Sequence, residues 1–174
     1  MNTANKLTML RVIMIPVFMV ALYLDFPFHS FVALVIFILA SVTDFIDGYI
    51  ARNFNQVTDF GKFMDPLADK LLVISAMLWF VEAGQMAAWV VLIVLAREFA
   101  VSGLRMVAAP KGIVIAAAWS GKIKTASTMV CICIMLLPIP AILNTLCVAV
   151  ILITTVVSGV EYFVKNRSAF SGAM

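Results

Sequence analysis

The chain has 174 residues, of which 64% are hydrophobic and only 12% are charged. About a quarter of the residues of a soluble domain are charged, so this composition excludes an ordinary water-soluble globular protein and indicates several membrane crossings. The formal net charge is +3, but no Lys/Arg-rich run with interleaved aromatic residues stands outside the apolar segments, so we expect no nucleic-acid partner.

Six apolar runs, separated by polar, glycine-containing or proline-containing breaks, predict six helices. In chain order these runs cover residues 7–24, 30–54, 60–81, 86–107, 117–137 and 142–164. A helix needs about 20 apolar residues to cross a bilayer, so each run is long enough for one crossing. We therefore predict an all-α integral membrane protein with six transmembrane helices, in which residues 1–174 form a single domain.

The basic residues predict the orientation of these helices. All 12 Lys and Arg residues lie in or near the N-terminus, the second-to-third connection, the fourth-to-fifth connection or the C-terminus. The other three connections contain no Lys or Arg. Because basic connections stay on the cytoplasmic side of a membrane, we expect both termini to be cytoplasmic.

Four aspartates converge on the connection between the second and third predicted helices. Asp44 and Asp47 share one face of the second helix, and Asp65 and Asp69 lie about 40° apart on the third. Unpaired acids within the hydrocarbon part of a membrane are costly. Hard divalent cations would offset this cost because they take carboxylate oxygens as ligands. The pattern predicts a two-metal site of the kind that clamps a transferring phosphoryl group. The structural alternative is ion pairing of the aspartates with Arg52, Lys62 and Lys70.

Two small residues share the face of the second predicted helix that carries the acids. Gly48 and Ala51 would let a flat ligand or its phosphates approach the helix backbone closely. Helix packing is the alternative, because small residues at this spacing are common at contacts between membrane helices. Their registration with the aspartates favours the ligand.

The spacing of these residues resembles a family signature. The pattern D-x2-D-G-x2-A-R-x8-G-x3-D-x3-D is present in full from Asp44 to Asp69, and it resembles the signature of the CDP-alcohol phosphotransferase family. Six membrane helices in a chain of this length also resemble that family. Less specific matches at residues 5–11, 96–105 and 120–125 resemble the bacterial phosphatidylglycerophosphate synthases within it.

The resemblance implies a reaction and a set of partners. The reaction is a Mg²⁺- or Mn²⁺-dependent transfer of a phosphatidyl group from CDP-diacylglycerol to an alcohol, with CMP as the leaving group. For the synthase group the acceptor is sn-glycerol 3-phosphate, and the product serves phosphatidylglycerol biosynthesis. The resemblance also implies a multi-pass homodimer in the bacterial cell membrane, with its active site facing the cytoplasm.

The same resemblance assigns roles by position in the signature. The two metal ions would be held by Asp44, Asp47, Asp65 and Asp69, and Asp69 would also be the general base toward the acceptor hydroxyl. The CDP-diacylglycerol side of the site would be formed by Gly48, Ala51, Arg52 and Gly61. The acceptor phosphate needs cations, and the candidates at the cytoplasmic ends of the fourth and fifth helices are Arg97, Arg105, Lys122 and Lys124.

Alternatives stay open at the level of the sequence. One is another acceptor within the same family, which would make the protein a cardiolipin, phosphatidylserine or phosphatidylinositol-phosphate synthase. Another, from a different class, is a divalent-cation transporter in which the acids form a permeation site. Against the transporter, the clustered acids lie toward one side of the membrane, and no polar residues line a route to the other side.

Overall fold

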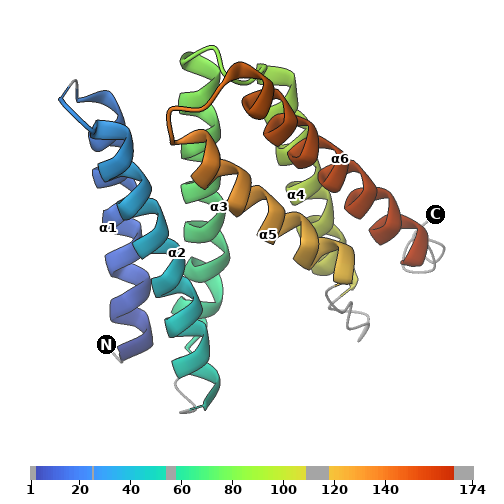
Figure 1. Ribbon diagram of the computed structural model, residues 1–174. Helices are drawn as coiled ribbons and strands as arrows, with labels where there is room; N and C mark the ends of the chain where they lie inside the picture. Colours follow the sequence, from blue (N-terminus) through green and yellow to red (C-terminus); the bar gives the residue numbers. More distant parts are fainter. Residues whose placement is uncertain (1–2, 25, 54–57, 109–117, 167–174) are drawn as a thin grey trace. The chain divides into compact units, whose positions relative to one another are not determined.

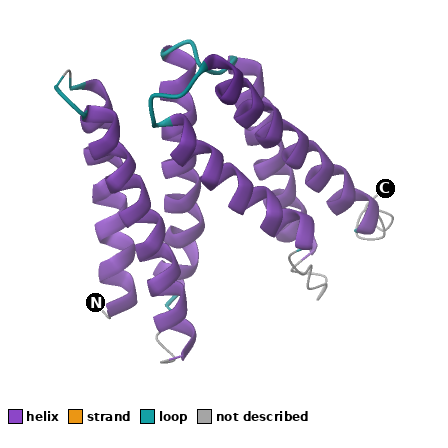
Figure 2. Ribbon diagram, viewed as in Figure 1, coloured by secondary structure: helices purple, strands orange, loops and turns teal. Residues whose placement is uncertain are grey.

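The computed structural model describes residues 3–24, 26–53, 58–108 and 118–166, with the backbone alone described at 3–6, 44–53, 59–60 and 62–63. Over these ranges the structure is all-helical and contains no strand (Figure 1 and Figure 2). The helices are α1 (Thr3–Tyr23), α2 (His29–Asn53), α3 (Asp59–Glu82), α4 (Ala88–Ala108), α5 (Trp119–Met135) and α6 (Ala141–Lys165). The six predicted helices are therefore confirmed, and their ends lie within about one helical turn of the predicted ends.

The helices form two compact units. Unit 1 comprises Met1–Ala83 and Ile132–Pro138, and so contains α1, α2 and α3. Unit 2 comprises Gly84–Cys131 and Ile139–Met174, and contains α4, α6 and most of α5. Each unit has its own buried side chains, so each can position its own functional residues.

Unit 1 is held together by α1, which contacts both α2 and α3. In Figure 1 α1 and α2 run side by side, and the Phe18 ring of α1 lies 5.7 Å from the Phe37 ring of α2 at an interplanar angle of 49°. Both rings are almost fully buried, and such a tilted aromatic pair adds about 0.5–1.5 kcal/mol to the burial of its area. The packing of α1 therefore keeps α2 and α3 in one unit.

Local caps fix both ends of α3. At its start the Thr58 hydroxyl oxygen accepts a hydrogen bond from the Gly61 N–H at 3.0 Å, which satisfies one of the free donors of the first turn. At its end the Ala83 N–H donates to the Trp79 carbonyl at 2.8 Å, and Gly84 follows with φ +70°, a conformation that glycine adopts without strain. The caps fix where α3 begins and ends, and hence how its aspartates are placed along it.

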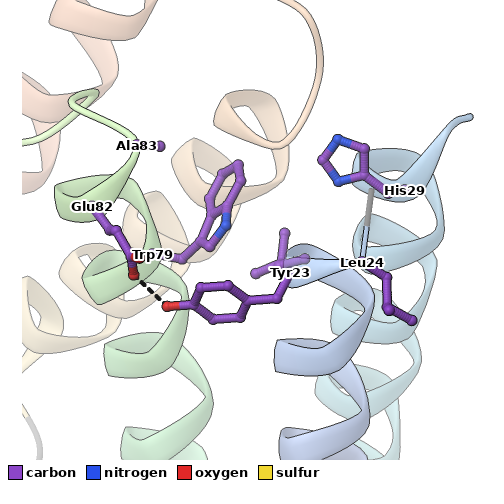
Figure 3. A pocket seen from close by; sticks show the side chains of 7 residues that line it. Tyr23, Leu24, His29, Trp79, Glu82 and Ala83 are labelled. Atoms are coloured by element: carbon purple, nitrogen blue, oxygen red, sulfur yellow. Dashed lines mark hydrogen bonds between the residues drawn. The ribbon is translucent and has the colours of Figure 1, made fainter. Parts of the chain in front are cut away.

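An open cavity of about 300 Å³ lies where α1 and α3 end in unit 1. Figure 3 shows its side chains, among them Tyr23, Trp79 and Glu82. The Tyr23 hydroxyl donates a hydrogen bond to Glu82 Oε2, which ties the last residue of α1 to the last residue of α3. This cavity is at the opposite end of α3 from the aspartates, so it is separate from the predicted metal site.

The buried face of α6 in unit 2 contains two small hydroxyl residues, and most aliphatic residues of this helix other than Ile151 are exposed. Thr155 and Ser158 are fully buried, whereas Ile153 and Val160 are 60% and 59% exposed. Buried hydroxyl residues together with many exposed aliphatic residues are typical of a helix that packs partly through small residues and faces lipid. Buried contacts hold α6 to α4, with Tyr162 of α6 packed beside Val101 and Leu104.

Among the helices of the described ranges, α6 is the one long and apolar enough to cross a bilayer. Shorter apolar stretches lie at Leu7–Tyr23 in α1 and His29–Thr43 in α2. Membrane insertion is therefore consistent with the structure, and the six crossings with cytoplasmic termini stay a prediction.

Candidate active site

The first half of the signature lies on the C-terminal part of α2. The helix runs without interruption to Asn53, so the helical spacing on which the sequence argument depends is present. The side chains of the signature residues on this helix lie outside the part of the chain that the structure describes; they are Asp44, Asp47, Gly48, Ala51 and Arg52. Their convergence on the acids of α3 therefore stays a prediction.

The second half of the signature lies on α3, and here the side chains are described. Asp65 and Asp69 are partly buried, and Gly61 is buried in the first turn. The Thr8 hydroxyl of α1, which is only 1% exposed, donates a hydrogen bond to Asp65 Oδ1 at 2.7 Å. A hydrogen bond to a carboxylate is stronger than one between neutral groups, so Thr8 orients the Asp65 carboxylate from a neighbouring helix.

A buried cation accompanies this contact. Arg11 lies one turn after Thr8 on α1 and is fully buried in unit 1. A buried guanidinium requires compensation by acids or other acceptors, so α1 contributes both a hydroxyl and a positive charge to unit 1. The sequence argument gave neither residue a role. The signal that could have found them is a polar pair at a spacing of three in an otherwise apolar helix.

The described donors fit a hard divalent cation. Asp65 and Asp69 are one turn apart on α3 and offer the carboxylate oxygens that Mg²⁺ and Mn²⁺ prefer. The described side chains contain no group of three or more His, Cys, Asp or Glu that could hold a metal ion. That search does not reach Asp44 and Asp47, so the two acids of α3 are the described half of the predicted ligand set.

In unit 2 two of the predicted acceptor-binding cations share one carboxylate oxygen. Glu98 Oε1 lies 3.0 Å from Arg97 Nη1 and 2.8 Å from Lys124 Nζ. The three side chains are 17%, 12% and 6% exposed respectively, so this is a largely buried charged cluster. The structure thus brings Arg97 of α4 and Lys124 of α5 together.

The other two predicted cations lie against aromatic rings. Arg105 Nε donates to the Tyr162 hydroxyl at 3.0 Å, and its guanidinium carbon is 5.7 Å from the centre of that ring. Lys122 Nζ lies 5.0 Å from the centre of the Trp119 ring. Within the described residues Arg97 and Arg105 contact different partners, although their spacing on α4 would have allowed both to face one anion.

Comparison with known proteins decides the family. A family model described as CDP-alcohol phosphatidyltransferase matches residues 1–160, which is most of the chain. The chain belongs to this family. The resemblance carried by the signature is thereby confirmed, and the CDP-alcohol phosphatidyltransferase family is generally dependent on divalent cations.

Curated relatives in this family match over most of the chain. The chain is 42% identical over 186 residues to the CDP-diacylglycerol–glycerol-3-phosphate 3-phosphatidyltransferase of Bacillus subtilis, covering 97% of this chain and 96% of the relative. It is 41% identical over 177 residues to a probable phosphatidylglycerophosphate synthase of Mycobacterium tuberculosis, covering 98% and 84%. A Salmonella typhimurium protein with the same name as the Bacillus relative is 43% identical over 134 residues, covering 74% and 73%.

Membership of the CDP-alcohol phosphatidyltransferase family makes the chain a transferase of phospholipid biosynthesis. The enzyme class expected from the signature is therefore confirmed. The same finding favours catalysis over cation transport as the reason for the aspartates.

Proposed function

We propose that the protein transfers the phosphatidyl group of CDP-diacylglycerol to sn-glycerol 3-phosphate, with release of CMP. The observation that carries this proposal is the complete signature on α2 and α3 in a chain 41–43% identical to relatives named for that reaction. The product, phosphatidylglycerophosphate, would serve phosphatidylglycerol biosynthesis. A cardiolipin, phosphatidylserine or phosphatidylinositol-phosphate synthase has no comparable support among these relatives.

The acids of unit 1 would hold two divalent ions, Mg²⁺ or Mn²⁺, through Asp44, Asp47, Asp65 and Asp69. When bound, such ions supply positive charge that neutralises a diphosphate and stabilises a departing phosphate. Asp69 takes the proton of the acceptor hydroxyl as the hydroxyl oxygen of the acceptor bonds to the phosphorus of the phosphatidyl group. The bond from that phosphorus to the CMP oxygen breaks, and CMP leaves. Thr8 supports this arrangement by orienting the Asp65 carboxylate.

The donor and the acceptor would use different residues. The cytidine diphosphate part of CDP-diacylglycerol would lie along the small and basic positions of the signature, Gly48, Ala51, Arg52 and Gly61. The phosphate of glycerol 3-phosphate would be bound by cations of unit 2. The buried pair Arg97 and Lys124 is the first candidate because its donors already lie together, and Arg105 and Lys122 are further candidates.

The proposal includes an arrangement in the membrane. All six helices cross the bacterial cell membrane, both termini are cytoplasmic, and the active site opens to the cytoplasm, where glycerol 3-phosphate is available. The aliphatic face of α6 and the confinement of Lys and Arg to alternate connections support this arrangement. We further propose that residues 1–174 act as one catalytic domain and that the protein is a homodimer, as the family resemblance implies.

The hydrogen bond from α1 gives a first prediction. Thr8→Val keeps the shape of the buried side chain but removes the donor to Asp65, so the carboxylate loses its fixed orientation. Loss of such a supporting contact typically costs about 10–100-fold in metal affinity or activity. We expect the rate of CMP release at saturating substrates to decrease by about 10–100-fold. The temperature of unfolding in detergent should change little. Thr8→Ser keeps the hydroxyl and should retain most of the activity; equal losses in both variants would contradict an orienting role.

An acceptor panel tests the proposed function. The purified protein in detergent receives CDP-diacylglycerol and Mg²⁺ with glycerol 3-phosphate, serine, inositol phosphate or phosphatidylglycerol as the acceptor, and CMP release is measured. We expect rapid release with glycerol 3-phosphate and background release with the others. A preference for any of the other three would leave the family assignment intact and overturn the proposed acceptor.

A further inference from the structure

Glu98 is the acidic centre of the buried cluster in unit 2, and neither the signature nor the family assignment gives it a role. One of its carboxylate oxygens, Oε1, accepts hydrogen bonds from Arg97 Nη1 on the same helix and from Lys124 Nζ on α5. Adjacent residues of a helix point about 100° apart, so the Arg97 contact bends both side chains toward one point. The Lys124 ammonium is brought to that point from 26 residues away in the chain.

The surroundings restrict where Arg97 can lie. A Cβ atom at Gly159 of α6 would be 3.3 Å from Arg97 Cγ, and one at Gly121 of α5 would be 3.4 Å from Arg97 Nη2. The two glycines therefore leave room for the Arg97 side chain to lie against both helices, and larger residues would displace it. Three helices of unit 2 thus meet at the Arg97 side chain.

The charge of the cluster leaves one positive charge in excess. Two cations and one carboxylate sum to +1, and their side chains are no more than 17% exposed. Arg97 Nε is buried and has no hydrogen-bond partner within the described residues. A buried charged donor without an acceptor is costly, so the cluster is suited to an incoming anion. Without the Glu98 carboxylate between them, the positive charges of Arg97 and Lys124 would repel each other.

We propose that Glu98 is a positioning residue for the acceptor phosphate. It holds the Lys124 ammonium beside the Arg97 guanidinium, so that both cations are in place before the dianion arrives and none of its binding energy is spent on overcoming their repulsion. This inference rests on the proposed function, because the anion is the phosphate of glycerol 3-phosphate. Glu98 acts through Arg97 and Lys124 and itself need not touch the substrate.

A double-mutant cycle tests the positioning role. Glu98→Gln keeps the size of the side chain and removes the charge that holds the cations together. We expect it to raise the KM for glycerol 3-phosphate about tenfold or more, as for the loss of a charge-assisted contact, with the KM for CDP-diacylglycerol unchanged. If Glu98 acts through Lys124, the double variant Glu98→Gln/Lys124→Gln should have the same KM for glycerol 3-phosphate as Lys124→Gln alone.

Controls distinguish a failure of the positioning role from misfolding of the variant and from failure of the proposed function. Glu161→Gln breaks the ion pair of Glu161 with Lys165 on α6 and should leave both KM values unchanged. If Glu98→Gln does not fold, the double variant, whose cluster keeps a net charge of +1, still provides the comparison with Lys124→Gln. An unchanged KM for glycerol 3-phosphate in Glu98→Gln, equal rises for both substrates, or additive effects in the cycle would each overturn the positioning role. A wild-type protein that does not use glycerol 3-phosphate would overturn the proposed function instead.

Discussion

Asp65→Asn is expected to lower the rate of CMP release about a thousandfold or more, with the helices intact. The substitution keeps the size of the side chain and leaves an oxygen that can still accept the hydrogen bond from Thr8, but it removes a negative charge. Since divalent cations bind carboxylates far better than amides, metal affinity should fall with activity. Asp44→Asn should behave in the same way if the acids of α2 and α3 form one site.

The measurement is CMP release over a range of Mg²⁺ concentrations, with thermal unfolding in detergent followed in parallel. If the four acids form one site as proposed, removal of one relieves repulsion among them, so the metal-free variant should be no less stable than the metal-free wild type. Glu82→Gln is a matched control because it neutralises an acid at the far end of the same helix. An Asp65→Asn protein that keeps more than about a tenth of the wild-type rate at saturating Mg²⁺ would count against the metal site.

Lys124→Gln should weaken binding of the acceptor, glycerol 3-phosphate, and leave binding of the donor, CDP-diacylglycerol, unchanged. Its side chain is 6% exposed, and its ammonium lies beside Arg97 at Glu98 Oε1, so it is placed to bind an anion with little competition from water. Loss of one charge-assisted phosphate contact costs on the order of 1.5–3 kcal/mol, which is about a 10–150-fold rise in the glycerol 3-phosphate concentration for half-maximal rate. The concentration of CDP-diacylglycerol for half-maximal rate should stay near the wild-type value.

Lys165→Gln provides the comparison for this result. Lys165 is 64% exposed at the end of α6 and pairs with Glu161 of the same helix, so its loss should leave saturation by both substrates unchanged. Normal saturation of Lys124→Gln by glycerol 3-phosphate would show that the acceptor phosphate is bound elsewhere, with Arg105 and Lys122 as the next residues to test.

The helices could be predicted from the sequence because their signals are local. Each apolar run is ended by polar residues, glycine or proline, and at α3 the helix ends coincide with Thr58 as the cap and Gly84 in the left-handed conformation. The spacing of Asp65 and Asp69 likewise needs only the helical repeat. A complete signature of this kind identifies a family without knowledge of tertiary contacts.

Side-chain partners between helices could not be predicted in this way. Thr8 and Asp65 are 57 residues apart, as are Arg105 and Tyr162, and their contacts depend on how each helix is rotated about its axis. Hydropathy barely specifies that rotation in helices that are apolar on all sides. The sequence therefore indicated a group of cations near the ends of the fourth and fifth helices, while the pairing of Arg97 with Lys124 through Glu98 emerged only from the structure.

The most direct test of the proposed reaction is the incorporation of labelled glycerol 3-phosphate into lipid by the purified protein. With CDP-diacylglycerol and Mg²⁺ or Mn²⁺ present, the label should enter a lipid with the mass of phosphatidylglycerophosphate, and one CMP should be released for each molecule formed. Incorporation should stop when the divalent cation is chelated and should be absent from Asp65→Asn. CMP release without label in the lipid, or incorporation that survives chelation, would contradict the proposed reaction.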